Sequence, residues 1–212
     1  MKKRGYGTDT FMIIGLIILI SMALFYFSKP PLKEEKEVDR LLRIPFDVVP
    51  IRAYVESCIQ TVAKDALLFI GQQGGYFDLP QYYTKYTKDS SIKTAYYFYL
   101  DENIMPSKDT ISQELSKYIN QNLLSCINDF ASFKQQGYAI DKGELNTITK
   151  IGLNDVVFQI TLPITVRKGE TETKLESFSQ PIENRLGVIY DTSKIIVNQQ
   201  TQDPSAICLS CL

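Results

Sequence analysis

The sequence predicts an α+β fold in which an N-terminal transmembrane helix carries an exterior domain. That domain is expected to pack two long helices on an antiparallel β-meander and to finish with a C-terminal helix. Three observations lead to this prediction: one uninterrupted apolar run, two long segments with helical periodicity, and three extended runs separated by short turns. With 44% apolar residues overall, the part after the apolar run can form one hydrophobic core.

The apolar run is Phe11–Phe27, which reads FMIIGLIILISMALFYF and contains no charged residue. At 1.5 Å per residue a helix of this length reaches about 26 Å, close to the thickness of the hydrocarbon core of a bilayer. A helix buried in a soluble core would normally carry a polar stripe, and this run offers none. We therefore expect residues 1–28 to form a basic head and a helix whose partner is the lipid bilayer.

The basic residues at positions 2–4 favour a cytoplasmic N-terminus and an exterior domain outside the cytoplasm. Basic residues also follow the apolar run, but they alternate with acidic ones. Two other interpretations stay open. Ser21-Met22-Ala23 fits a signal-peptide cleavage pattern, and Lys3-Arg4-Gly5 resembles a type IV prepilin leader, although Thr10 stands where that family usually has glutamate.

Residues 29–47 begin with two prolines and then become densely charged, which predicts a solvated stalk. The exterior domain is expected over 48–212, and it would continue further if the natural chain is longer. Its first helix should run from Pro50 to Ile70, because apolar residues recur there at steps of three and four. Glycines at 71, 74 and 75 should end it.

The aromatic segment Ile92–Leu100 is expected to be a strand. A second long helix should begin near Ser107, with Ser107 or Asp109 as its N-cap, and should end at Gly137. Its predicted buried stripe consists of Ile111, Leu115, Ile119, Leu123, Cys126, Phe130 and Phe133.

Three extended runs follow at 144–151, 155–167 and 170–181, and the turns between them predict a meander of hairpins. Pro163 lies inside the middle run and indicates a bulge or an edge. Lys174 and Glu176 alternate with less polar neighbours, so the other face of the sheet should be wet. A final helix is expected over about 183–200.

Histidine is absent from the sequence. Because histidine is the usual general base near neutral pH and a frequent metal ligand, serine–histidine and cysteine–histidine nucleophile systems and histidine-containing zinc sites are excluded. The formal net charge is −1, whereas a nucleic-acid binder needs a basic surface. The sequence therefore predicts a protein that is not an enzyme, holds no metal or cofactor and binds no nucleic acid.

Cys58 and Cys126 lie on or beside the apolar stripes of the two long predicted helices. Packing of these helices would bring the two sulfur atoms together, and we prefer this disulfide among the pairings that four cysteines allow; two buried free thiols are the alternative. Cys208 and Cys211 form a C-x-x-C. A redox thiol needs a helix N-terminus, and Cys208 lies too far beyond Asp203, the expected cap, so packing or a structural bridge is favoured over a redox or zinc site.

Aromatic residues are concentrated in the segment between the first helix and the predicted strand. In a binding interpretation, this loop presents stacking surfaces for sugars or for a partner chain. In the interpretation that we favour, the rings anchor the loop and pack across strands. The candidate binding aromatics are Tyr76, Phe77, Tyr82, Tyr83 and Tyr86.

The segments VESCIQTVAKDALLFIGQQGGY (55–76) and DPSAICLSCL (203–212), behind a basic head and anchor, resemble a group of uncharacterised single-pass membrane-anchored proteins from small-genome archaea. This resemblance implies a membrane-anchored chain, and it implies neither catalytic residues nor a cofactor.

The leading functional hypothesis is a membrane-anchored extracytoplasmic protein that acts as a non-catalytic binding or envelope-assembly module, with a protein or a surface polymer as its partner. One alternative is a membrane-tethered thiol-disulfide oxidoreductase that uses Cys208 and Cys211. Another is a type IV pilin-like subunit cleaved after Gly5.

Overall fold

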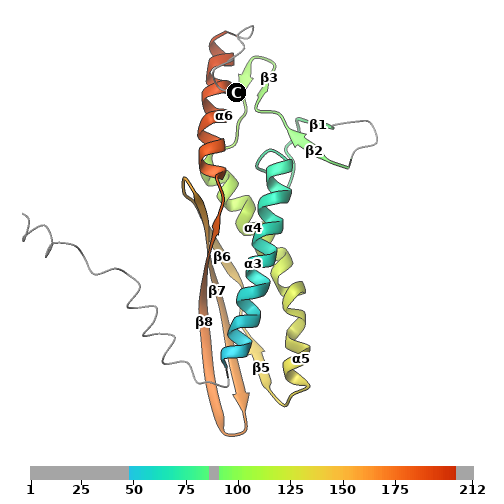
Figure 1. The fold of residues 1–212 in the computed structure, drawn as a ribbon. Helices are drawn as coiled ribbons and strands as arrows, with labels where there is room; N and C mark the ends of the chain where they lie inside the picture. Colours follow the sequence, from blue (N-terminus) through green and yellow to red (C-terminus); the bar gives the residue numbers. More distant parts are fainter. Residues whose placement is uncertain (1–47, 86–90, 204–212) are drawn as a thin grey trace, which may run out of the picture. The chain divides into compact units, whose positions relative to one another are not determined.

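The computed structural model describes residues 48–85 and 91–203 (Figure 1). This part of the chain is an α+β fold of helices and antiparallel sheets. Its elements are α3 (Val49–Gln72), β1 (Tyr83–Lys85), β2 (Lys93–Ala95), β3 (Phe98–Tyr99), β4 (Glu102–Asn103), α4 (Lys108–Ile127), η1 (Asn128–Phe130), α5 (Ala131–Lys134), β5 (Ala139–Lys142), β6 (Asn146–Ile151), β7 (Asp155–Lys168), β8 (Thr171–Glu183) and α6 (Leu186–Gln202).

Several predictions fall on residues that the structure does not describe. These are the anchor Phe11–Phe27, the stalk at 29–47, Tyr86, and the C-x-x-C of Cys208 and Cys211. Within residues 48–85 and 91–203, none of the helices combines the length and the apolar character that a membrane span requires.

Helix α3 agrees with the helix that was expected over 50–70 and extends it slightly at both ends. Pro50 lies in its first turn, where a proline removes no helical hydrogen bond. The helix ends where the N–H of Gly75 donates to the carbonyl oxygen of Ile70 at 2.8 Å. Gly74 and Gly75 have φ angles of 72° and 92°, a conformation that favours glycine.

Helix α4 begins at the predicted cap, since the hydroxyl of Ser107 accepts the N–H of Thr110 at 3.0 Å. The prediction that this helix continues until Gly137 is wrong, because α4 ends at Ile127. The next three residues, at 128–130, have φ angles of 47°, 49° and 56°. A right-handed helix cannot pass through such a left-handed run, and α5 starts only after it.

Tyr54 of α3 gives the physical reason for this early end. Its hydroxyl group lies 3.1 Å from the carbonyl oxygen of Cys126 and 3.2 Å from that of Ile127, as a donor to the last turn of α4. Its ring meets the buried ring of Phe130 edge-on at 6.4 Å. The left-handed turn therefore places Phe130 in the core while Tyr54 satisfies carbonyl groups that the helix end leaves open.

The main sheet has β7 at its centre, with β8 along one side and both β5 and β6 along the other. All of these pairs are antiparallel. The order of β6, β7 and β8 confirms the predicted meander. Strand β5 was not predicted; it has four residues and pairs with the end of β7 at 164–167.

The bulge expected at Pro163 is present. The register of β7 and β8 shifts between the pairs Thr161–Ser177 and Ile164–Leu175, so two residues of β7 face one residue of β8. On the other side of β7, the N–H of Gly143 donates to the carbonyl oxygen of Pro163 at 2.7 Å. The gap between β5 and β6 therefore lies beside the bulge.

The prediction of one strand over Ile92–Leu100 is wrong. This segment forms β2 and β3, which belong to two separate two-stranded sheets. Leu100 and Asp101 have φ angles of 50° and 63°, so the chain turns back there and β4 pairs with β3. Aromatic residues indicated a strand but not where the chain reverses.

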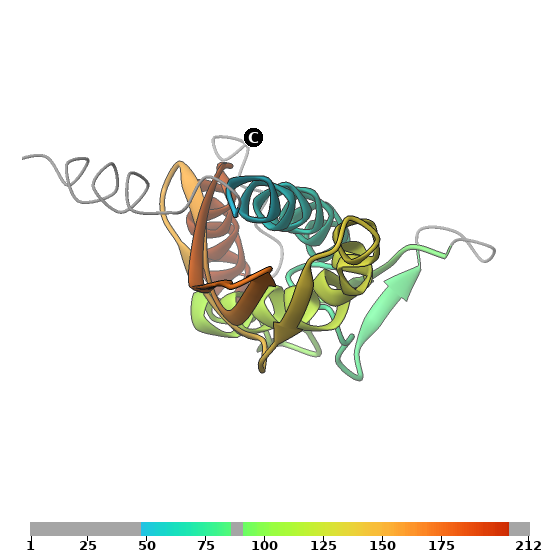
Figure 2. The same ribbon diagram turned by 90° about the horizontal axis from the view of Figure 1, so that it is seen from below.

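Helices α3 and α4 lie side by side on one face of the main sheet (Figure 2). Helix α4 contacts β6 and helix α3 contacts β8. Alternate residues of β7, from Val156 to Val166, are buried under the two helices. Lys174 and Glu176 of β8 are exposed, which confirms that the other face is wet. Helix α6 starts at Leu186, a few residues later than expected, because β8 continues to Glu183.

Candidate functional site

The two long helices are joined covalently. Cys58 of α3 and Cys126 of α4 form a disulfide with their Cα atoms 5.7 Å apart and a separation of 68 positions in sequence. The preferred pairing is therefore confirmed. Because zinc binds thiolates, a disulfide also removes these two sulfur atoms from any four-cysteine zinc site.

One of the five candidate aromatics, Phe77, anchors its own loop. Phe77 packs edge-on against Phe69 of α3 at 6.0 Å and against Tyr118 of α4 at 5.2 Å. The backbone N–H groups of Phe77 and Asp78 both donate to Oε2 of Glu114, at 2.7 Å and 2.9 Å.

Tyr76 precedes this anchored segment and is half-buried. Burial first, and the nearby carboxylate of Glu114 second, raise the pKa of its hydroxyl. Phe77 therefore holds the loop against α3 and α4.

Tyr82 and Tyr83 lie closer to solvent. The ring of Tyr82 stacks on Tyr99 with centroids 4.7 Å apart, and Tyr96 stacks on the same ring at 5.4 Å. Tyr83 lies under the ammonium group of Lys93, which is 5.2 Å from the ring centroid. The rings of Tyr82, Tyr96 and Tyr99 therefore pack on one another, whereas Tyr83 contacts a cation.

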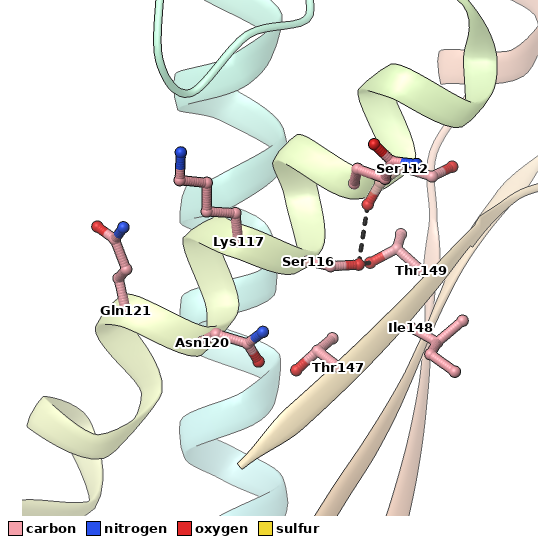
Figure 3. A pocket seen from close by; sticks show the side chains of 9 residues that line it. Ser112, Ser116, Lys117, Asn120, Gln121, Thr147, Ile148 and Thr149 are labelled. Carbon is pink, nitrogen blue, oxygen red and sulfur yellow. Dashed lines mark hydrogen bonds between the residues drawn. The ribbon is translucent and has the colours of Figure 1, made fainter.

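The structure brings together a different set of polar side chains, in a groove between α4 and β6 (Figure 3). The groove has a volume of about 480 Å³, which lies within the range of small-ligand sites. Helix α4 and strand β6 supply all of its walls. The lining residues are Ser112, Gln113, Ser116, Lys117, Asn120, Gln121, Thr147, Ile148 and Thr149.

Hydroxyl groups join the two walls at one point. The Oγ atom of Ser116 lies 2.9 Å from the carbonyl oxygen of Ser112 and 2.9 Å from Oγ1 of Thr149, and is hydrogen-bonded to both (Figure 3). Thr149 is buried, with 6% of its surface exposed. This contact fixes the distance between the helix and the strand at the middle of the groove.

Farther along the groove, two oxygen atoms have no hydrogen-bond partner. Oγ1 of Thr147 and Oδ1 of Asn120 are both buried and unsatisfied, and Figure 3 shows their side chains in the space between α4 and β6. Thr147 is 5% exposed. Burying an unpaired polar atom costs about 1–3 kcal/mol. The wall of the groove therefore holds two oxygen atoms whose hydrogen-bonding capacity is unused within the protein.

Lys117 forms one rim of the groove. Its ammonium group makes an ion pair with Asp78, and the hydrogen bond from this ammonium group to Asp78 is the main reason why its pKa is raised. The ion pair connects the rim to the loop that Glu114 holds. Lys117 is thus positioned by its neighbours, and the other lining side chains are uncharged.

Sequence reasoning did not single out this groove, although a signal was present. Ser112, Ser116 and Asn120 recur every four residues on α4, next to the apolar stripe. Thr147 and Thr149 occupy the inward-facing positions of β6, where apolar side chains would be expected. Polar residues in phase on two elements that pack together mark a polar interface.

No group of three or more His, Cys, Asp or Glu side chains able to hold a metal ion occurs in the part of the chain that the structure describes. No family model matches the sequence, and neither the curated proteins nor the solved structures contain a match.

Proposed function

We propose that this chain is a membrane-anchored extracytoplasmic protein whose α+β domain binds another protein and catalyses no reaction. The groove between α4 and β6 is the observation that carries this proposal. Its walls offer hydroxyl and amide groups, and two of their oxygen atoms, on Asn120 and Thr147, are buried without a partner. Such groups form hydrogen bonds with a ligand that supplies donors.

The disulfide supports the extracytoplasmic location. Disulfides between distant segments persist in oxidising compartments, whereas cytosolic thiols are kept reduced. The bond between Cys58 and Cys126 joins two long helices, and no free cysteine lies among the described residues. Together with the apolar run Phe11–Phe27 and the basic head before it, this supports an anchored domain outside the cytoplasm.

The chemistry of the groove supports binding without catalysis. General acid–base catalysis needs a titratable group poised near the working pH. Lys117 is the one titratable side chain in the lining, and its pKa is shifted upward, away from neutrality, by its contact with Asp78. Recognition through neutral hydrogen bonds is what the remaining side chains can offer.

Photo-crosslinking in intact membranes tests the binding proposal. A photoreactive residue in place of Gln121, at the groove, should yield a discrete crosslinked protein, and the same residue in place of Glu176, on the wet face of β8, should not. The crosslink should disappear in a Ser112→Leu variant, in which a larger side chain fills the groove. It should persist in Ser125→Leu, the same substitution at an exposed position of α4 outside the groove. Equal crosslinks from both positions, or crosslinks unaffected by Ser112→Leu, would contradict the proposal.

Protease shaving of intact cells tests the location. The domain should be cleaved by a protease added outside, and a fragment that contains the apolar run should stay with the membrane after a carbonate wash. Cleavage only after the cells are opened would place the domain on the cytoplasmic side. Release of the intact chain by carbonate would contradict the anchor.

A further inference from the structure

Strand β6 has a free edge. Among the described strands it pairs only with β7, so its other side is not covered by a strand. The N–H of Gly152 donates to the carbonyl oxygen of Asp155 at 2.8 Å, and this pair closes the hairpin between β6 and β7. In an antiparallel ladder, hydrogen-bonded and non-hydrogen-bonded pairs alternate.

Counting back from Gly152 by this alternation identifies which backbone groups face outward. Lys150 and Ile148 belong to hydrogen-bonded pairs with Val157 and Gln159 of β7. The residues between them, Thr147 and Thr149, therefore direct their N–H and C=O groups away from β7. These are the same two residues whose side chains line the groove.

The groove lies along this edge and not over the sheet. Thr147 and Thr149, which face the helices, and Ile148, which faces the opposite side with 54% of its surface exposed, all line the groove. No residue of β7 lines it. A space that meets both faces of one strand, but does not reach the next strand, must run beside the strand.

We infer that the groove binds an extended polypeptide segment that adds to the sheet as a strand next to β6. This inference rests on the proposed function and names the form of the partner. An added strand would pair with the outward backbone groups of Thr147 and Thr149. Its side chains on the helix side would meet Asn120 and Ser116, so small polar side chains that donate hydrogen bonds fit there best.

The unsatisfied oxygen atoms favour this occupant over an apolar one. Oδ1 of Asn120 can only accept a hydrogen bond, and Oγ1 of Thr147 is buried within the same groove. A polypeptide provides N–H donors at a regular spacing, and residues on one side of a strand repeat every second position. An apolar helix or lipid chain would leave both oxygen atoms unpaired.

Peptide selection followed by N-methylation tests the inference. Random 12-residue peptides displayed on phage would be selected on the full-length chain, with prior removal of those that bind the Ser112→Leu variant. Synthetic versions would then carry an N-methyl group at one position at a time. Binding should fall about tenfold or more at every second position in the paired segment, since each such group removes a backbone hydrogen bond. The positions between should change binding by no more than about twofold.

Hydrogen exchange on the protein gives an independent measurement. When the selected peptide binds, the exchange rates of the amides of Thr147 and Thr149 should fall by a factor of about ten or more. The amides of Ile148 and Lys150, which are already paired with β7, should change much less. A Ser125→Leu variant, altered at an exposed position of α4 outside the groove, should bind the peptide as the parent chain does.

The outcomes separate this inference from the proposed function. Loss of binding without an alternating pattern, or protection that is equal at 147–150, would show recognition by side chains alone and would overturn strand addition. Failure to select any peptide that depends on Ser112 would also overturn it. The protein-binding proposal would then stand or fall on the crosslinking result from position 121.

Discussion

Gly187 of α6 lies directly against the carbonyl group of Gly152 in the turn between β6 and β7. A Cβ atom placed on Gly187 would stand 2.1 Å from that oxygen, closer than any real contact. Two further hydrogen bonds fix the same junction. The N–H of Asn184 donates to the carbonyl oxygen of Asn154 at 3.0 Å, and Oδ1 of Asn184 accepts the N–H of Leu186 at 2.8 Å. The start of α6 is thus locked to the hairpin of the main sheet.

A Gly187→Ala substitution should therefore destabilise the protein. The added methyl group would overlap backbone atoms, which cannot move aside as the end of a flexible side chain can, and overpacking of this kind costs about 1–3 kcal/mol. The free energy of unfolding, measured by chemical denaturation, should fall by that amount. The matched control is Gly71→Ala near the end of α3, where a Cβ atom meets nothing within 4 Å. It should raise stability by about 0.5–1 kcal/mol, because alanine is the better helix former. Equal effects of the two substitutions would contradict the contact at Gly187.

Removal of the disulfide should lower stability more than any single surface substitution. The bond closes a loop of 68 residues, and in the chain-entropy model a loop of this length contributes about 4 kcal/mol. A Cys58→Ala, Cys126→Ala double variant should lose that amount in chemical denaturation, and a reducing agent should destabilise the parent chain but not the variant. Equal stability of the parent chain with and without the reducing agent would contradict this prediction.

Asp129 should make stability depend on pH in the acidic range. Its carboxylate accepts hydrogen bonds from Lys134, at 2.6 Å, and from Lys142, and these contacts lower its pKa from 3.8 to about 2. Because the pKa is lower in the folded chain than in the unfolded chain, the stabilisation is present above pH 3.8 and is lost as the pH falls from 3.8 towards 2. An Asp129→Asn variant should show a smaller loss of stability between pH 5 and pH 2.

The control for this measurement is Glu144→Gln, which neutralises an exposed carboxylate between β5 and β6. It should keep the pH dependence of the parent chain. If Asp129→Asn left the acid profile unchanged, the two lysine contacts would not persist in solution.

Much of the fold could be predicted because its largest elements follow simple periodicities. The apolar stripe from Ile51 to Ile70 predicted α3, and the turns around β7 predicted the meander. The position of the two cysteines on helical stripes predicted their disulfide. The errors arose where a long-range contact decided the local structure. Helix α4 ends before Asn128 because Tyr54, far away in sequence, packs against Phe130.

The candidate site was harder to predict than the fold. Its parts come from α4 and β6, and a single sequence does not show that Asn120 and Thr147 meet across 27 positions. The spacing of polar residues on α4 reads equally well as a solvated helix face. Their burial against β6, and the lack of partners for two oxygen atoms, became visible only in three dimensions.

Tyr54→Phe should weaken the junction between α3 and α4 without disturbing its packing. The substitution keeps the ring contacts with Phe130 and Phe133, at 6.4 Å and 5.4 Å, and removes only the hydroxyl donor to the end of α4. The free energy of unfolding should fall by about 1 kcal/mol, the net contribution of one hydrogen bond. Amides in the last turn of α4 should also exchange faster. A Tyr190→Phe variant, altered at a half-buried tyrosine of α6 away from this junction, should leave those exchange rates unchanged.

The two inward-facing threonines of β6 test whether a side chain that lowers the stability of the protein also contributes to binding at the groove. They occupy equivalent positions on one strand, with 5% and 6% of their surface exposed, but their hydroxyl groups differ. Oγ1 of Thr149 is hydrogen-bonded to Ser116 at 2.9 Å, whereas Oγ1 of Thr147 has no partner. Replacement by valine keeps the shape and the strand preference of threonine while it removes the hydroxyl.

We therefore expect opposite effects on the free energy of unfolding. Thr149→Val should destabilise the protein by about 1 kcal/mol, because it loses a satisfied hydrogen bond, and Thr147→Val should stabilise it by a similar amount, because it removes a buried oxygen that lacks a partner. Chemical denaturation of the two variants measures both effects. Crosslinking from position 121 should nevertheless weaken in Thr147→Val, since the hydroxyl that costs stability is the one that has no partner within the protein. If Thr147→Val were as unstable as Thr149→Val, the hydroxyl of Thr147 would already be hydrogen-bonded in the free parent protein, by ordered water for example. It would then not be available to bind a partner.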